Sequence, residues 1–433
     1  MTKNFFLILF LIFLNNCSFH DATGFWSKQK KIKEEKSNLQ ALFEKKEIQE
    51  VEFNNNIKIS ANFKKINFNK DSIFNNNDGF ITSIDKLENI SRYNFSKIKN
   101  FKKIDANLIS HNKNIIFFDN KGSIFCFDEN KKLVWKNNIY TKEEKKIGPL
   151  IILHKKKDKL FAADNLGNYY SMNIDTGLLN WKKKHTSPFN SEIKAYKNRI
   201  YIVDSNNTLH SYLAENGTKV WSHITEKSFI NSLKRLSIVI KDNTVIFNNS
   251  LGDITAVNAR NGKLLWQTVT FNSRIYEDLM SLKTSDLIID EQSIYFSNNK
   301  YEFYSLDIQT GLINWKQEIS SNIKPTVIEN LVFTVSNNGF QNIIEKKTGN
   351  IIKVNDIFYQ FSSKKRNKIF PSGFVISSDY LYLSTSHGKL VIVDWKIGKV
   401  TNIMNIDGGL ISRGFVNNQK MYIVKDNSII ELH

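Results

Sequence analysis

One short phrase recurs along this chain and constrains its fold more than any other feature. It reads as a strand, a tight turn and a second strand that ends on tryptophan. The five copies are FDENKKLVW (127–135), SMNIDTGLLNW (171–181), LAENGTKVW (213–221), TAVNARNGKLLW (255–266) and YSLDIQTGLINW (304–315). Their last residues are about 40 to 50 positions apart, which is the period of a four-stranded propeller blade.

A second unit precedes each copy of the phrase and recurs three more times after the last copy. It consists of a β-branched or aromatic strand, a polar turn and an alternating strand. Its eight copies begin at Ile115, Leu160, Ile200, Val245, Ile294, Val332, Leu381 and Met421. The late copies keep the turn glycines Gly349 and Gly398 but have Lys353 and Asn402 where tryptophan would stand. Because one blade cannot bury both of its faces, neighbouring blades must stack. The sequence therefore predicts an all-β fold, an eight-bladed β-propeller of quinoprotein-like repeats.

The tryptophans that end the phrase are predicted to be packing residues. One large aromatic side chain per repeat is what the wedge between two blades requires, and its ring fills that space. We therefore assign a blade-packing role, rather than a ligand-stacking role, to Trp135, Trp181, Trp221, Trp266 and Trp315.

The C-terminus indicates how the ring of blades closes. The last copy supplies strands at 410–416, 421–424 and 428–432, and the chain then stops at His433. Three strands leave an unpaired edge, which propellers remove by pairing across the termini. The segment NISRYNFS (89–96) is the predicted outer strand of this blade. One propeller domain is therefore expected at residues 51–433.

The N-terminus has the pattern of an exported lipoprotein. Lys3 precedes ten apolar residues at 5–14, a run too short to span a membrane, and Cys17 follows shortly afterwards. This arrangement resembles the bacterial lipoprotein signal and predicts a signal peptide at residues 1–16 and lipidation of Cys17. The alternative is an ordinary signal peptide with an incidental cysteine. Ser18 resembles the outer-membrane sorting pattern.

Residues 17–50 differ from the rest of the chain because they are rich in Lys and Glu and poor in strand formers. They are predicted to be a charged tether between the lipid and the propeller. If Cys17 is lipidated, Cys126 is the one cysteine left, so no intramolecular disulfide is expected. Cys126 lies in an apolar strand, where a free thiol acts as a small buried hydrophobe.

The charge of the chain raises the question of an anionic partner. The sequence has 61 Lys and Arg against 42 Asp and Glu, and its formal net charge is +19. Such an excess can indicate binding to nucleic acid or to an anionic membrane. The lysines are scattered at strand ends, however, as at 155–157 and 182–184. Since an exported protein does not meet nucleic acid, no nucleic-acid partner is predicted.

The repeat D-x-x-T-G-x-x-x-W resembles that of quinoproteins, so a dehydrogenase that depends on pyrroloquinoline quinone (PQQ) is one alternative. Many of those enzymes have adjacent cysteines and some have a C-x-x-C-H haem site, and this sequence has neither. The eight histidines do not show H-E-x-x-H spacing, and no G-x-S-x-G elbow occurs. We therefore predict no enzyme activity, no cofactor and no metal site.

The lipoprotein start, the charged tether and the eight blades together resemble the BamB family, the propeller lipoproteins of the outer-membrane β-barrel assembly machinery. IGPLI (147–151) and IFPSGFVISSDYLYL (369–383) resemble the alphaproteobacterial branch of that family. The resemblance implies a non-catalytic scaffold, lipid-anchored at the periplasmic face of the outer membrane. Its implied partners are a POTRA domain of the barrel subunit BamA and unfolded outer-membrane proteins. A generic periplasmic propeller adaptor is the other alternative.

The resemblance also implies partner-binding residues. Docking loops of the family carry a Leu-Arg pair before one blade and an acidic pair before the next. SLKR (232–235) lies where the first pair would fall, so Leu233, Lys234 and Arg235 are the candidates there. The second place falls near 280–284, which lacks both acids, and Glu277 and Asp278 are the candidates close by.

Overall fold

A computed structural model describes residues 78–81, 87, 90–99, 101, 108–226, 234–270, 281–417 and 419–433 of the chain. The chain divides into two compact units, Met1–Glu52 and Phe53–His433, and all described residues belong to the second. The predicted signal peptide, Cys17 and the tether therefore lie outside the described residues, as does the predicted domain boundary at residue 51.

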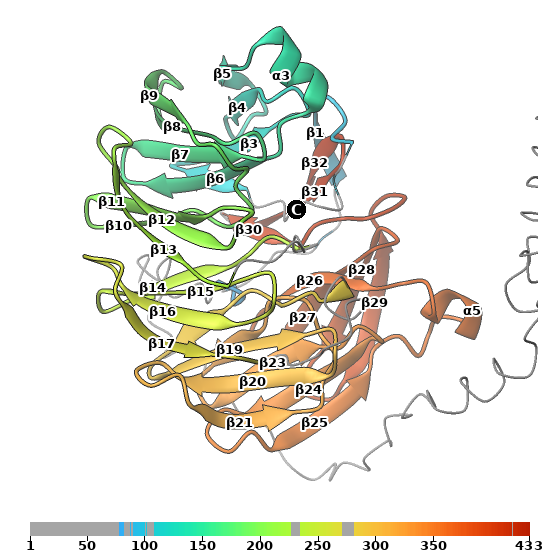
Figure 1. Cartoon of the computed structure of the whole chain (residues 1–433). Coiled ribbons are helices and arrows are strands. Elements are labelled where there is room, and N and C mark those ends of the chain that lie inside the picture. Colours follow the sequence, from blue (N-terminus) through green and yellow to red (C-terminus); the bar gives the residue numbers. More distant parts are fainter. Residues whose placement is uncertain are drawn as a thin grey trace, which may run out of the picture. The chain divides into compact units, whose positions relative to one another are not determined.

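The second unit is an eight-bladed β-propeller, which confirms the fold predicted from the repeats (Figure 1). Its described residues form eight four-stranded antiparallel sheets, each of which is one blade. Blade 1 contains β2 (Ile109–His111), β3 (Asn114–Phe118), β4 (Ile124–Phe127) and β5 (Leu133–Asn137). Blade 2 contains β6 (Ile151–Lys156), β7 (Lys159–Asp164), β8 (Asn168–Asn173) and β9 (Leu179–Lys184).

The middle blades follow in chain order. Blade 3 contains β10 (Lys194–Tyr196), β11 (Arg199–Val203), β12 (Thr208–Leu213) and β13 (Lys219–Ile224). Blade 4 contains β14 (Ile238–Lys241), β15 (Thr244–Asn248), β16 (Ile254–Asn258) and β17 (Leu264–Thr268). Blade 5 contains β18 (Ile288–Asp290), β19 (Ser293–Asn298), β20 (Glu302–Asp307) and β21 (Ile313–Gln317).

The last three blades complete the ring. Blade 6 contains β22 (Thr326–Ile328), β23 (Leu331–Val335), β24 (Phe340–Glu345) and β25 (Ile351–Asp356). Blade 7 contains β26 (Pro371–Ile376), β27 (Tyr380–Thr385), β28 (Lys389–Asp394) and β29 (Lys399–Asn405). Blade 8 contains β30 (Phe415–Asn417), β31 (Lys420–Lys425), β32 (Ser428–Leu432) and β1 (Ile90–Asn94).

Two short helices of the described region lie in connections between blades. α3 (Lys142–Ile147) leads from blade 1 to blade 2 and begins with a capping box, in which Thr141 and Glu144 each accept the backbone N–H of the other. α5 (Ser363–Arg366) leads from blade 6 to blade 7. In the part of the chain that the structure describes, no helix has the length and apolar character needed to cross a bilayer.

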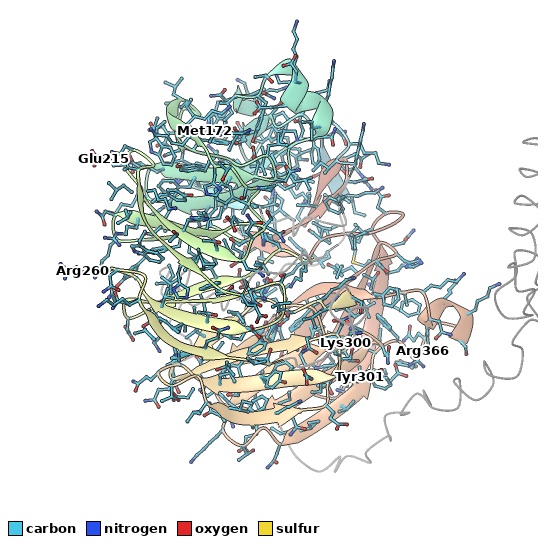
Figure 2. The ribbon with its side chains drawn as sticks, in the orientation of Figure 1. Met172, Glu215, Arg260, Lys300, Tyr301 and Arg366 are labelled. Carbon is cyan, nitrogen blue, oxygen red and sulfur yellow. The ribbon has the colours of Figure 1, made fainter. Side chains whose placement is uncertain are left out.

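The antiparallel order of the strands gives the propeller two different faces. The connections between blades and the turns between second and third strands lie on one face, which we call the connection face. The turns between third and fourth strands lie on the opposite face, which we call the turn face. In Figure 2, Lys300 marks a turn of the connection face, whereas Glu215 and Arg260 mark turns of the turn face.

The ring closes through β1, as the sequence predicts. β1 pairs antiparallel with β32 along its whole length and lies beside it in Figure 1. Tyr93 of β1 is 4% exposed, and its hydroxyl donates a hydrogen bond of 2.8 Å to the buried carboxylate of Glu431. An N-terminal strand therefore completes the last blade, and β32 is not left as an open edge.

The first strand of blade 8 is shorter than predicted. Regular pairing begins at Phe415 and not at residue 410. Ser412 accounts for part of this difference, because its hydroxyl accepts the Val424 N–H (2.8 Å) where a ladder carbonyl would normally do so. One backbone bond remains at this position, from the Ser412 N–H to the Val424 carbonyl (2.9 Å), so the side chain replaces only half of the regular pairing.

The repeat tryptophans pack between neighbouring blades. The indole rings of Trp135, Trp181, Trp221, Trp266 and Trp315 lie against the turn glycines of the next blade, which are Gly177, Gly217, Gly262, Gly311 and Gly349. Each indole N–H donates to a backbone carbonyl of that next blade, at 2.9 to 3.3 Å. Every such contact therefore joins two blades by burial and by a directed hydrogen bond.

These glycines are required for two reasons. Their φ angles are positive, between 69° and 78°, and a Cβ added at any of them would lie 2.4 to 2.6 Å from an indole carbon.

In blade 6, Lys353 stands in the tryptophan position, and its ammonium donates a hydrogen bond to the carbonyl of Lys396 in blade 7, at 2.6 Å. Lys353 thus keeps the hydrogen bond between blades but not the aromatic packing.

Asp407 ties the closing strand to its neighbours. Its carboxylate accepts hydrogen bonds from Arg92 of β1 (2.5 Å) and from Lys425 of β31 (2.6 Å). Burial alone would raise the pKa of Asp407, but the hydrogen bonds from Lys425 and Arg92 lower it to about 2. The ionised carboxylate is therefore favoured by the folded state.

We expect Asp407→Asn to lower the free energy of unfolding by about 1 kcal/mol at neutral pH, after allowance for solvent screening at this partly exposed site. The pKa of Asp407 in the folded state lies below the unfolded value of about 3.9. The stabilisation by the ionised Asp407 is therefore complete above about pH 4 and is lost as the pH falls toward the folded pKa. Urea denaturation at about pH 6 and pH 3 measures the change. Glu129→Gln, which removes an exposed pair with Lys113, is the control. A penalty of equal size at both pH values would contradict the assignment.

Candidate functional site: the charged central cavity

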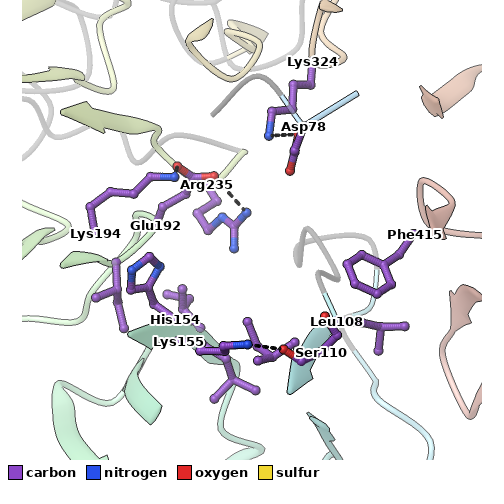
Figure 3. A pocket seen from close by; sticks show the side chains of 14 residues that line it. Asp78, Leu108, Ser110, His154, Lys155, Glu192, Lys194, Arg235, Lys324 and Phe415 are labelled. Atoms are coloured by element: carbon purple, nitrogen blue, oxygen red, sulfur yellow. Dashed lines mark hydrogen bonds and ion pairs between the residues drawn. The ribbon is translucent and has the colours of Figure 1, made fainter. Parts of the chain in front are cut away.

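A cavity of about 290 Å³ lies where the first strands of several blades meet (Figure 3). β2, β6, β10 and β30 contribute to its wall, together with connections that precede other first strands. Its charged lining residues are the cations Lys155, Lys194, Arg235 and Lys324 and the acids Asp78 and Glu192. His154 adds no charge, because burial and the nearby Lys194 lower its pKa to about 3. The lining is therefore net positive.

Lys234 and Arg235, two of the predicted partner-binding residues, lie just before β14. Arg235 lines this cavity, whereas Lys234 lines a smaller cavity of about 40 Å³ that shares Lys324 with it. The ammonium of Lys234 is 2.9 Å from Asp286 Oδ1, and the Arg235 guanidinium is 3.6 Å from Glu192 Oε1. Glu192 precedes blade 3 and Asp286 precedes blade 5, so the two cations connect three successive blades. Their side chains are 20% and 10% exposed, which leaves the charged groups only narrow access to solvent.

The electrostatic setting of Asp286 shows how strongly this cluster favours negative charge. Burial would raise the pKa of Asp286, but Lys234, Lys324 and Arg235 lower it well below the usual range of a carboxyl group. A carboxylate that enters the cavity is therefore stabilised by several cations at once. The arrangement suits an acidic partner group better than a basic one.

A segment from before the first blade already places such a carboxylate in the cavity. Asp78 lies 2.6 Å from the ammonium of Lys324 and 2.9 Å from the guanidinium of Arg413. The backbone beside it is fixed against β26, because Ile376 N–H donates to the Gly79 carbonyl and Ile81 N–H donates to Ile376. The sequence analysis did not identify Asp78, since no local pattern shows that it meets residues more than 200 positions away.

Several predicted residues cannot be placed. Leu233, Glu277 and Asp278 lie outside the described residues, as does Cys17. Cys126 is described: its side chain is buried, and burial raises the pKa of its thiol to about 11. The thiol is therefore protonated and unreactive at neutral pH.

One group of potential metal ligands occurs among the described residues. Donor atoms of His185, Asp204 and His210 all lie within 4.8 Å of one another. The sequence analysis missed this group, because His185 comes from the connection after blade 2 and the other two from blade 3. Alignment of the repeats is the signal that could have found it, since His210 occupies the position that Tyr170 has in blade 2.

Known proteins resemble this chain in sequence and in fold. A family model described as outer membrane protein assembly factor BamB matches residues 120–355. The outer membrane protein assembly factor BamB of Shewanella oneidensis is 20% identical over 270 residues, which cover 62% of this chain. The match spans 66% of that relative, just under two thirds of its length.

Solved structures share the propeller. The crystal structure of BamB from Moraxella catarrhalis superposes with a TM-score of 0.64 and 14% identity, over 79% of this chain and 100% of that chain. The quinohemoprotein alcohol dehydrogenase from Comamonas testosteroni superposes with a TM-score of 0.61 and 10% identity, over 82% of this chain and 78% of that chain. At such identities the likeness concerns the fold alone.

Proposed function

The chain belongs to the family of outer membrane protein assembly factor BamB, whose model matches more than half of its length, and on this premise we propose that it is a non-catalytic scaffold of outer-membrane β-barrel assembly. The family match is the observation that carries the proposal. The sequence supports the non-catalytic role, because it lacks the paired cysteines and the haem site found in quinoprotein dehydrogenases.

The proposed partner is a POTRA domain of the barrel subunit BamA. The cationic cavity lined by Arg235 and the smaller cavity lined by Lys234 support a docking site at these two residues, because their cations favour acidic groups. An arginine beside apolar residues is a frequent binding hot spot, since its planar guanidinium can hold a carboxylate with two hydrogen bonds. Leu233, Glu277 and Asp278 complete the proposed contact region.

We expect the double change Lys234→Ala and Arg235→Ala to weaken binding of a purified POTRA fragment at least about tenfold, which corresponds to about 1.4 kcal/mol. The reason is that the change removes two positive charges that favour an acidic partner group, together with their ion pairs to Asp286 and Glu192. Calorimetric titration measures the affinity, and thermal melting checks that the variant is folded. Lys155→Ala is the matched control, because Lys155 lines the same cavity as Arg235 but its ammonium donates to the carbonyl of Ser110. An unchanged affinity in the double variant would remove these residues from the site.

Unfolded outer-membrane proteins are a second proposed partner. The fourth strands of blades 1 to 5 form the outer edges of their sheets and expose apolar side chains, which supports pairing with extended chains. Those side chains are 40% to 59% exposed and belong to Leu133, Val134, Leu179, Val220, Ile224, Leu264, Leu265 and Ile313.

The proposed location is the periplasmic face of the outer membrane, with Cys17 as the lipid attachment site. Each buried CH₂ of a lipid chain contributes about 0.8 kcal/mol, so several chains hold a protein firmly where one would be marginal. We expect Cys17→Ser to move the protein from the membrane fraction to the soluble periplasmic fraction. Fractionation after a high-salt wash measures this. Membrane association that survives the substitution and the wash would exclude this anchor.

A further inference from the structure

A histidine pair and a carboxylate meet where blade 2 joins blade 3. His185 directly follows β9, Asp204 directly follows β11, and His210 lies in β12. Asp204 and His210 are each 3% exposed, whereas His185 is half-buried. The ring centres of the two histidines are 4.5 Å apart. The group therefore lies at the junction of two blades on the connection face, with one side chain open to solvent.

Hydrogen bonds hold the carboxylate and one imidazole in place. Asp204 Oδ1 accepts the backbone N–H groups of Asn206 (2.9 Å) and Thr208 (3.0 Å), which fixes the orientation of the carboxylate. Its other oxygen, Oδ2, lies 3.0 Å from His210 Nε2. With Nε2–H donating to Asp204, the lone pair of His210 is on Nδ1. That nitrogen is buried and has no hydrogen-bond partner among the described residues.

The second imidazole can present a nitrogen with little rearrangement. His185 Nδ1 lies 3.2 Å from the carbonyl oxygen of Ser187 and 3.1 Å from the N–H of the same residue. When Nδ1 carries the proton it donates to the carbonyl, and Nε2 is then left with a lone pair. A histidine that ligates a metal commonly donates its other N–H to a backbone carbonyl in this way.

Blade 2 shows what the same position looks like without histidine. Asp164 and Tyr170 have the places of Asp204 and His210 in the repeat, and Tyr140 comes from the preceding connection. The Tyr140 hydroxyl donates to Asp164 Oδ2 (2.7 Å) and lies 3.3 Å from the Tyr170 hydroxyl. Two phenols and a carboxylate thus satisfy one another there. Two imidazoles at the next junction leave one buried nitrogen unsatisfied, which is costly without a further partner.

We propose that His185, Asp204 and His210 bind one divalent transition-metal ion, of the class of Zn²⁺ or Co²⁺, at the junction of blades 2 and 3. Two imidazole nitrogens and a carboxylate oxygen suit these borderline ions, whereas Ca²⁺ and Mg²⁺ prefer oxygen ligands throughout. Bond lengths of about 2.0 to 2.2 Å require the donor atoms to approach more closely than their present limit of 4.8 Å. The half-buried His185 is the side chain free to make that movement.

The bound ion would join the connection of one blade to the next blade. If His210 binds the ion through Nδ1, Asp204 lies at the opposite nitrogen of the ring and orients the imidazole. If His210 binds through Nε2, the Asp204 oxygen beside that nitrogen is the third ligand. An ion that binds only the folded state raises the stability of that state by mass action. The ion is therefore expected to stabilise the propeller as well as to bind.

The test is a titration of the mature chain, carrying no histidine tag, with Co²⁺ and separately with Zn²⁺. We expect a single equivalent to bind, with a visible absorption band for Co²⁺ and a raised melting temperature for Zn²⁺. The double variant His185→Tyr and His210→Tyr restores the residue types of blade 2 and should fold. It is expected to bind at least about a hundredfold more weakly and to lose the absorption band.

Two further variants make the result specific. His185→Gln changes only the half-buried ligand, and it should also lose the absorption band. His223→Gln alters a histidine in the fourth strand of blade 3 that lies outside the group, and it should bind like the natural chain. Equal binding by the natural chain and the double variant would overturn the proposal, and so would a natural chain that binds neither ion. Both outcomes are independent of whether the POTRA domain binds.

Discussion

Removal of β1 is expected to lower the free energy of unfolding by at least about 5 kcal/mol, a large part of the stability of a typical domain. β1 and the residues after it bury Tyr93, Ile98 and Phe101, which are 4%, 1% and 6% exposed. Burial of a large apolar side chain contributes about 1.5 to 3 kcal/mol. Without β1, the backbone groups of β32 would also form an open edge.

The comparison uses two shortened chains. One begins at residue 87 and keeps β1, and the other begins at residue 102 and lacks it. Urea denaturation measures the difference, and a synthetic peptide of residues 87–101 is expected to restore part of the lost stability by pairing with β32. Equal denaturation midpoints for the two chains would show that β1 does not close the ring.

Trp266→Ala is expected to cost about 3 to 5 kcal/mol, because it removes a large ring from the junction of blades 4 and 5. The indole is 8% exposed and donates to the Ile308 carbonyl at 3.0 Å. Gly311→Ala is also destabilising, by about 1 to 3 kcal/mol, because a Cβ there would lie 2.4 Å from the indole. The positive φ of 72° adds backbone strain for any other residue.

A double-mutant cycle separates these causes. When the indole is absent, Gly311→Ala no longer meets the ring, and only the backbone strain and the close approach to the Thr268 hydroxyl (2.8 Å) remain. The two changes together should therefore cost less than the sum of the single changes, by about 1 kcal/mol or more. Leu265→Ala is the control, since Leu265 is 51% exposed and its loss should change stability by less than about 0.5 kcal/mol. Strict additivity would contradict the direct contact between ring and turn.

Local repeats made most of the fold predictable. The period of the tryptophans and the turn glycines predicted the blades, since both features act within one blade and its neighbour. The missing fourth strand of the last blade predicted the pairing of β1 with β32. Trp395 was not assigned a role, because it lies outside the repeat phrase. It fills the core between blades 6 and 7, where its ring meets Phe333 edge-on and its N–H donates to the Ser377 carbonyl.

The candidate sites were harder to predict because the stacking of neighbouring blades and the closure of the ring create them. Lys234 and Asp286 are 52 positions apart, and Asp78 is 335 positions from Arg413. No sequence spacing indicates such contacts, which depend on the stacking of whole blades. The resemblance to a family suggested Lys234 and Arg235, but it did not predict that both side chains form ion pairs with carboxylates of neighbouring blades.

The most direct test of the scaffold function is capture of the full-length, lipidated chain from mildly crosslinked host membranes, with identification of the captured proteins by mass spectrometry. We predict that the barrel subunit with its POTRA domains is recovered, and that the Lys234→Ala, Arg235→Ala variant recovers much less of it. A folded natural chain that recovers no component of the assembly machinery would contradict the proposed function and favour a generic periplasmic adaptor.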